Sequence, residues 1–186
     1  MKILTAIVGA ALLTTGAFAQ SKPFQASLTP DVALYDRNTR IEGLSLSIWG
    51  ENPQTSLAIG LVNGSTGHSA GLSLALLVNY ADSYTGLQWG FINYTKGDFV
   101  GWQGGFLFGI AVSAVNYTGG SMKGLQTGVV NYAGKLTGLQ LGLLNYAASA
   151  ETGVQIGLVN LMPENRWFSG LPGELAPGFP FVNWRF

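Results

Sequence analysis

Few residues of this sequence could support covalent chemistry, and the most suggestive is a serine in a Gly-x-Ser-x-Gly pattern. Gly67-His68-Ser69-Ala70-Gly71 matches the nucleophile elbow, in which a serine stands on a strand-to-helix turn. That chemistry needs a separate histidine as general base. His68 is the single histidine of the chain, and it is adjacent to the serine. Residues 72–79 continue an alternating apolar pattern instead of beginning a helix. We therefore interpret the match as a chance product of Gly- and Ser-rich turns and expect no catalytic residue.

The remaining polar residues do not group into a metal, cofactor or nucleic-acid site. There is no cysteine, and the acidic residues stand singly, so neither a metal ion nor a cofactor is predicted. Nine Lys and Arg balance nine Asp and Glu, and without a basic stripe nucleic acid is not an expected partner. Trp49, Trp89, Trp102 and Trp167 could form a binding stripe, although packing in a core or cap is the expected role. The partner stays unknown, with outer-membrane or cell-surface components as candidates.

Side-chain amides recur with a regular spacing. The phrase Gly-Leu-Gln-x-Gly-x-x-Asn-Tyr is cleanest over 138–146, and further copies begin at Gly86, Gly124 and Gly153. Successive phrase asparagines are 16, 14, 23, 15, 14 and 15 residues apart, and the long gap indicates an irregular unit or an insertion. A short fixed period predicts a repeat architecture in which these residues are structural. The repeated asparagines are Asn63, Asn79, Asn93, Asn116, Asn131, Asn145 and Asn160.

Within one phrase, period-2 alternation predicts a β-strand. Leu139, Leu141 and Leu143 share one face, and Gln140 and Gly142 share the other. A helix is disfavoured because each of the two glycines per unit would cost about 1 kcal/mol relative to alanine. If each unit is one coil, equivalent residues stack at about 4.8 Å. We then expect leucines in inward ladders, amide ladders of Gln and Asn, and tyrosines stacked on tyrosines.

The predicted fold is all-β: a repeat β-solenoid of about eight short coils, with an N-terminal strand and a Pro-rich C-terminal cap. The alternative is an antiparallel outer-membrane-type β-barrel of about 8–10 strands. The barrel is suggested by the unit length and by a chain end that carries Trp184 and Phe186. The solenoid is favoured because the connections are uniform, whereas barrels alternate short turns with long loops.

The ends of the chain differ from the repeats. Lys2, an apolar run over 3–13 and Ala17-Phe18-Ala19 predict a signal peptide over 1–19. Residues 20–40 are predicted as an N-terminal strand and turn, 41–162 as the β-repeat domain, and 163–186 as a C-terminal cap and final strand. We therefore expect an exported protein of the bacterial outer membrane or cell surface, with the periplasm as the alternative location. Without cysteine, an N-terminal lipid anchor is not expected.

The sequence resembles the leptospiral-type bacterial surface-repeat proteins in its repeated phrase, in residues 24–30 at the start of the mature chain and in residues 179–184 near its end. The resemblance covers nearly the whole mature chain. It implies an exported, surface or outer-membrane-associated protein with no catalytic residues to carry over. Our hypothesis is a non-enzymatic exported surface or envelope β-repeat protein with a structural or adhesive role and an unknown ligand. The alternative is a small outer-membrane β-barrel that acts as a pore or membrane scaffold.

Overall fold

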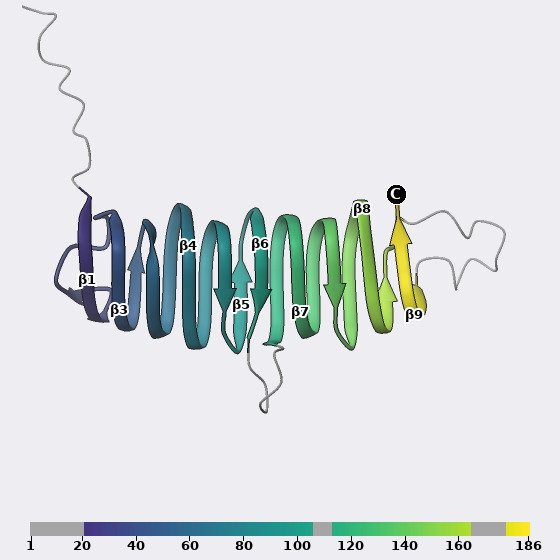
Figure 1. Cartoon of the computed structure of the whole chain (residues 1–186), viewed down its shortest axis with the longest axis horizontal. Coiled ribbons are helices and arrows are strands. Elements are labelled where there is room, and N and C mark those ends of the chain that lie inside the picture. The colour runs from purple at the N-terminus through teal and green to yellow at the C-terminus, as the bar shows by residue number, and fades with distance from the viewer. Residues whose placement is uncertain (1–20, 106–112, 165–177) are drawn as a thin grey trace, which may run out of the picture.

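The computed structural model of the chain describes residues 21–105, 113–164 and 178–186 (Figure 1). The predicted signal peptide, part of the irregular unit, most of the predicted cap and Trp167 lie outside these ranges. Among the described residues no helix is long and apolar enough to cross a membrane. The strands are β1 (Lys22–Thr29), β2 (Val32–Ala33), β3 (Ile41–Asn52), β4 (Gln54–Trp89), β5 (Ile92–Thr95), β6 (Phe99–Gly104), β7 (Ser113–Leu141), β8 (Leu144–Leu161) and β9 (Gly178–Arg185).

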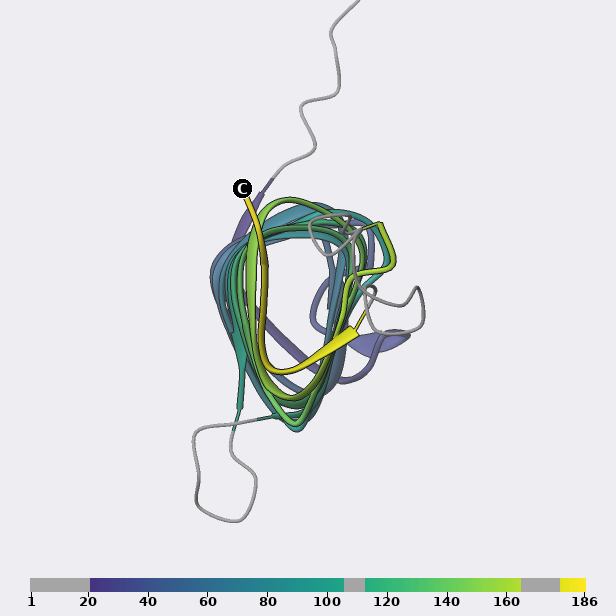
Figure 2. The same ribbon diagram turned by 90° about the vertical axis from the view of Figure 1, so that its right-hand side faces the viewer.

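These strands wind around one axis as stacked coils, and the chain forms an all-β solenoid of about nine turns. Seen along the axis, the coils superimpose on a rounded, tapering outline (Figure 2). Neighbouring turns run parallel with like residues opposite each other: Asn131 lies opposite Asn145, and Tyr132 lies opposite Tyr146. The solenoid prediction is therefore confirmed. The antiparallel barrel alternative is wrong, because consecutive units run in the same direction.

The two ends of the stack explain why there is one turn more than the eight expected. β1 pairs parallel with β3, so the predicted N-terminal strand is itself a rung of the solenoid. The short β2 then pairs antiparallel with the far side of β1. At the other end, β9 pairs antiparallel with β8. Both ends of the stack thus carry a strand that reverses the common direction.

The first glycine of most phrases is required by close contact between rungs, with Gly153 as an exception. Gly138 has a φ of +141°, and a Cβ atom added to it would lie 2.1 Å from the carbonyl oxygen of Gly124 on the rung before. Left-handed backbone of this kind is open to glycine at little cost, because glycine has no Cβ. The equivalent glycines have φ between +121° and +146° and meet the preceding rung in the same way; they are Gly43, Gly71, Gly86, Gly101 and Gly124.

The interior of the solenoid is largely polar, which corrects one expectation. Gln140 and Asn145 are completely buried, whereas Leu143 and Leu144 are 54% and 37% exposed. Leucines were predicted to form inward ladders, and the structure places them outside. Among the described residues, buried polar side chains outnumber buried apolar ones. The apolar core is a narrow column that lies along the stack, made of Ala81, Tyr84, Phe99, Met122, Ala133, Leu136, Ala147, Ala150 and Met162.

The close approach at Gly138 gives a test of the coil geometry. Gly138→Ala should lower the free energy of unfolding by roughly 3 kcal/mol or more, because the rungs must separate and the backbone is strained. Gly67→Ala is the matched control: Gly67 also has a positive φ, +60°, but a Cβ there meets nothing within 4 Å. Its cost should stay near the 1–2 kcal/mol of left-handed backbone alone. Equal losses in urea unfolding would contradict the proposed contact.

Candidate interaction surface

Ser69 and His68 do not form a catalytic pair. The Ser69 side chain points into the solenoid and is buried, and its hydroxyl donates to the carbonyl oxygen of Thr66 at 2.8 Å. The same hydroxyl accepts from the backbone N–H of Gln54 at 3.0 Å. His68, the residue before Ser69 in β4, is exposed. Because the elbow requires a nucleophile at the mouth of a site, this serine has the geometry of a structural hydrogen bond.

All seven repeated asparagines lie in one buried ladder. The Nδ2 of each asparagine donates to the Oδ1 of the asparagine on the next rung, at 2.8–3.4 Å. The 23-residue gap does not interrupt the column, because Asn93 donates directly to Asn116 at 2.9 Å. The extra residues therefore lie within one rung, between Gln103 and Asn116, each of which keeps its place in its ladder. At the C-terminal end, Asn160 donates to the backbone carbonyl of Phe179 in β9 at 3.1 Å.

The phrase glutamines form a second buried ladder with the opposite direction. Here the Nε2 of each glutamine donates to the Oε1 on the preceding rung, at 2.8–3.0 Å. The column contains Gln88, Gln103, Gln126, Gln140 and Gln155. The asparagine donors thus point toward the C-terminal end of the stack, and the glutamine donors point toward the N-terminal end. Each buried amide obtains a partner from an identical side chain one rung away.

The second glycine of the phrase makes room for the asparagine ladder. A Cβ added at Gly142 would lie 2.6 Å from the Nδ2 of Asn131, and one added at Gly128 would lie 2.7 Å from the Nδ2 of Asn116. These distances are too short for any side-chain carbon. Glycine and asparagine therefore recur together because the amide occupies the volume that a side chain at the glycine would need.

Aromatic residues stack outside the amides. The rings of Tyr94, Tyr117, Tyr132 and Tyr146 form a half-exposed column with centroids 4.6–5.2 Å apart and nearly parallel planes. This stacking was predicted from the repeat and is confirmed. Of the predicted tryptophan stripe, Trp89 and Trp102 pack edge to face at 4.9 Å.

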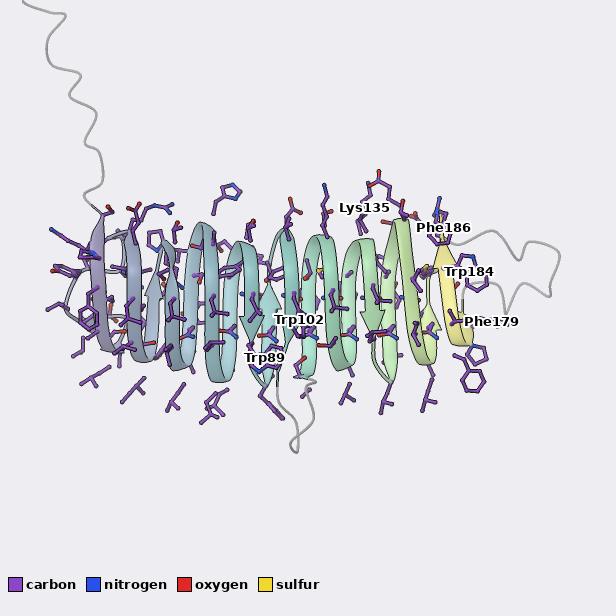
Figure 3. All side chains as sticks on the ribbon, viewed as in Figure 1. Trp89, Trp102, Lys135, Phe179, Trp184 and Phe186 are labelled. Carbon is purple, nitrogen blue, oxygen red and sulfur yellow. The ribbon has the colours of Figure 1, made fainter. Side chains whose placement is uncertain are left out.

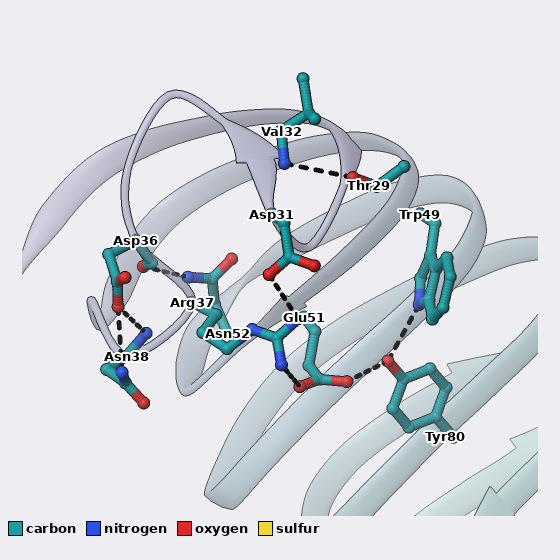
Figure 4. Close-up of polar contacts among 10 residues, drawn as sticks. All are labelled: Thr29, Asp31, Val32, Asp36, Arg37, Asn38, Trp49, Glu51, Asn52 and Tyr80. Carbon is teal, nitrogen blue, oxygen red and sulfur yellow. Dashed lines mark hydrogen bonds and ion pairs between the residues drawn. The ribbon is translucent and has the colours of Figure 1, made fainter.

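A cluster of ionisable residues lies at the N-terminal end (Figure 4). Arg37 contacts Asp31 at 2.9 Å and Glu51 at 3.9 Å, and Glu51 accepts from the hydroxyl of Tyr80. Trp49 donates its Nε1–H to that hydroxyl at 3.0 Å. Burial, assisted by Glu51, raises the pKa of Tyr80 to about 12. A raised pKa is the opposite of what an activated tyrosine nucleophile needs. The contacts of Arg37 with Asp31 and Glu51 attach the N-terminal turn to the stack.

An apolar ridge lies along one outer edge of the stack. Its described members fall in two groups, on four neighbouring rungs from Ile48 to Phe91 and on two rungs from Leu143 to Val159. Between them in the chain lie residues 106–112, outside the described ranges, and the half-buried Val129 and Val130. The ridge lies where each rung bends after the second glycine, and side chains drawn in carbon alone project along this edge in Figure 3. Its members are all at least 37% exposed. We define the apolar ridge as Ile48, Trp49, Leu61, Leu76, Leu77, Phe91, Leu143, Leu144, Leu158 and Val159. Near β1 the apolar surface continues into an open depression of about 550 Å³ lined by Leu28, Val32, Leu34, Leu46 and Ile48, among others.

Charged side chains lie on the opposite edge of the coils. Between Asn52 and Ala150 the charged residues all follow an Asn-Tyr pair and precede the next phrase, and all of them are exposed. They are Asp82, Lys96, Asp98, Lys123 and Lys135. Figure 3 places Lys135 on the edge away from the apolar row. The solenoid is thus amphipathic across its section, with a ridge free of charge on one side and a charged edge on the other.

Sequence reasoning missed this ridge. Alternation shows that Leu and Gln lie on opposite faces, but it does not show which face is inside. The available signal was the second glycine, whose missing side chain leaves room on the same face for an amide. The cluster around Tyr80 was also missed, because Arg37, Glu51 and Tyr80 are distant in sequence and carry no motif. Among the described residues, no three His, Cys, Asp or Glu side chains group as metal ligands.

Comparisons of the chain with protein-family models, with curated proteins and with solved structures find no match.

The asparagine ladder predicts that two nearby substitutions lower the stability of the protein by different amounts. Asn131→Leu should destabilise the protein by roughly 2–6 kcal/mol, because it leaves a buried donor on Asn116 and a buried acceptor on Asn145 without partners. Lys135→Ala should cost less than about 0.5 kcal/mol, because its 3.4 Å ion pair with Glu151 is exposed. Urea unfolding of both variants measures the difference. If the two lose equal stability, the ladder does not hold the fold.

Two tyrosines predict how stability changes in alkali. The pKa of Tyr80 is raised to about 12, and burial raises the pKa of Tyr84 as well. A raised pKa in the folded state means that unfolding takes up hydroxide, so stability should be constant below pH 10 and fall as the pH rises toward 12. Both Tyr80→Phe and Tyr84→Phe should reduce this fall, measured as the free energy of unfolding from pH 8 to 11.5.

The same two variants should differ at pH 7. Tyr80→Phe loses the hydrogen bond to Glu51 and should be less stable by about 1 kcal/mol. The buried hydroxyl of Tyr84 has no hydrogen-bond partner among the described residues, so Tyr84→Phe should be equally stable or more stable by about 1 kcal/mol. A loss of stability in Tyr84→Phe would mean that its hydroxyl is bonded.

Proposed function

We propose that this protein is a non-enzymatic, exported β-repeat protein of the bacterial surface or envelope, with a structural or adhesive role. The observation that carries the proposal is the apolar ridge, whose exposed members among the described residues are all uncharged. Large exposed apolar patches on soluble proteins mark interaction sites. The protein therefore acts through its outer surface and not through a cleft.

The interior supports a structural use of the repeat residues. The repeated asparagines and glutamines, the most regular polar residues of the chain, are buried and bonded to one another. They hold the rungs in register, and at the two ends of the glutamine column Gln88 Nε2 and Gln155 Oε1 are buried without a hydrogen-bond partner among the described residues. Variation between units falls on the outer positions, where Leu, Ile, Val, Phe and Trp replace one another. The ladder thus builds a rigid body, and the outer side chains supply its contacts.

The predicted signal peptide and the resemblance to leptospiral-type surface-repeat proteins supply the location in this proposal. A barrel acting as a pore is not retained, because the fold is a solenoid. Outer-membrane or cell-surface components stay the candidate partners.

Export is tested by expressing the full chain in a Gram-negative host beside a chain that begins at Gln20. The full chain should leave the cytoplasm, and N-terminal sequencing of the mature protein should begin at Gln20. The shortened chain should stay in the cytoplasm. An unprocessed full chain that stays in the cytoplasmic fraction would contradict export, whatever surface the protein uses.

A further inference from the structure

We propose that the apolar ridge binds the acyl-chain region of a lipid bilayer, so that the protein lies along a membrane surface with its charged edge in water. The inference deepens the proposed function and rests on it in one respect: the protein must act through its outer surface. It names the partner of that surface as lipid instead of another protein.

The size of the apolar surface is the first argument. The four neighbouring rungs from Ile48 to Phe91, at about 4.8 Å per rung, cover roughly 19 Å of the stack. The outer positions from the leucine of the phrase to the residue before its asparagine span roughly 17 Å of extended chain. Their product is roughly 330 Å², and the two rungs at Leu143 and Leu158 add roughly 160 Å². The ridge thus reaches the range of about 300–600 Å² of the largest apolar patch on a typical monomer, a patch that is often functional.

The shape of the ridge favours a fluid partner. In a flat strand successive side chains point to opposite faces, yet Leu143 and Leu144 are both exposed, as are Leu158 and Val159. Two consecutive outward residues require a convex corner, which is where the coils taper in Figure 2. A convex edge meets a rigid flat or convex partner only along a line. Acyl chains conform to it and can cover the splayed side chains on both flanks.

The order of side chains around each rung is the second argument. The ridge is aliphatic, with single aromatic residues at Trp49 and Phe91. The tyrosine column follows it immediately along the chain, with Tyr94 43% exposed, and charged residues such as Lys135 come next. The sequence apolar, then tyrosine, then charged matches the depth profile of a bilayer, in which tyrosine and tryptophan concentrate at the interface with water. Amphipathic elements that lie in this interface insert about 5–10 Å.

The charge distribution predicts that the lipid headgroup matters little. The charged edge begins five residues after the ridge at Leu77 and at Phe91, roughly 17 Å of extended chain, and the Debye length in physiological salt is about 8 Å. At Trp49 the charges of Arg37 and Glu51 lie nearer, but they pair with each other. In the chain from Gln20 onward, which lacks Lys2, eight positive and nine negative side chains nearly balance. Binding should therefore depend on the acyl phase and not on anionic lipid.

The experiment uses the chain from Gln20 onward, which contains every residue that the structure describes, and sucrose-loaded phosphatidylcholine vesicles that are sedimented with bound protein. The ridge variant carries Leu76→Ser, Leu143→Ser and Leu158→Ser, each at a side chain more than half exposed. Its partition coefficient should fall by about 100-fold. The control variant carries Lys123→Ser, Lys135→Ser and Glu151→Ser and should bind as the parent does.

Two further readouts separate lipid from other partners. Binding of the parent should be unchanged by 0.5 M salt and by added phosphatidylglycerol. Acyl chains labelled with bromine should quench the parent's fluorescence, and Trp49→Phe should remove most of that quenching. If the ridge variant does not fold by circular dichroism, Leu76→Ser alone, at a side chain 69% exposed, should weaken binding by about fivefold.

Several results would overturn the inference: no sedimentation of the parent with vesicles, equal binding by the parent and the ridge variant, or binding that requires phosphatidylglycerol. A stable dimer of the parent that the ridge variant disrupts, without vesicle binding, would assign the ridge to a second copy of the chain. None of these results bears on export, so the inference and the proposed location can fail separately.

Discussion

The fold depends on the hydrogen bond between identical side-chain amides on successive rungs. An asparagine that donates to one neighbouring rung and accepts from the other keeps both of these hydrogen bonds only if both neighbours carry an asparagine in the same register. A slip by one residue would remove the buried partners of Asn116, Asn131 and Asn145 together. This coupling explains why residue identity repeats along the chain, where an ordinary core would conserve only polarity or size.

The amide ladders also determine what surrounds them. Glycine must stand where Gly142 stands, because the amide of Asn131 fills the adjacent volume. With amides and glycines inside, the alternating leucines are forced outward. Among the described residues, the column that contains Met122 and Leu136 provides most of the buried apolar packing. The two ladders run in opposite directions, so the dipoles of the asparagine column oppose those of the glutamine column. Stacked amides of this kind therefore add little net dipole along the axis.

Much of this architecture could be predicted from the sequence, because the residues of the ladders recur along the chain with a regular spacing. The coil, the asparagine column and the tyrosine stack around Tyr132 all follow from one phrase and a short period. The inward or outward sense could not be predicted from alternation, which is symmetric between the two faces. The usual rule that leucine is buried then gave the wrong answer, because satisfied amides make a polar interior possible. The Arg37–Glu51–Tyr80 cluster could not be predicted, because it depends on which residues of the first turns come together in space, and no local sequence pattern indicates this.

The reversed strands at both ends have a consequence for the size of the particle. A stack of parallel rungs offers free backbone edges on which further copies of the chain could grow as a fibre. β9 pairs antiparallel with the last rung, and its Phe179 carbonyl accepts the hydrogen bond from Asn160 at the end of the asparagine ladder. β9 also contains Pro180, which has no N–H with which to pair a further strand. At the first rung β2 covers part of the exposed edge of β1. The protein therefore has the strand stacking of a cross-β filament but a fixed length, because its ends do not template the addition of further copies.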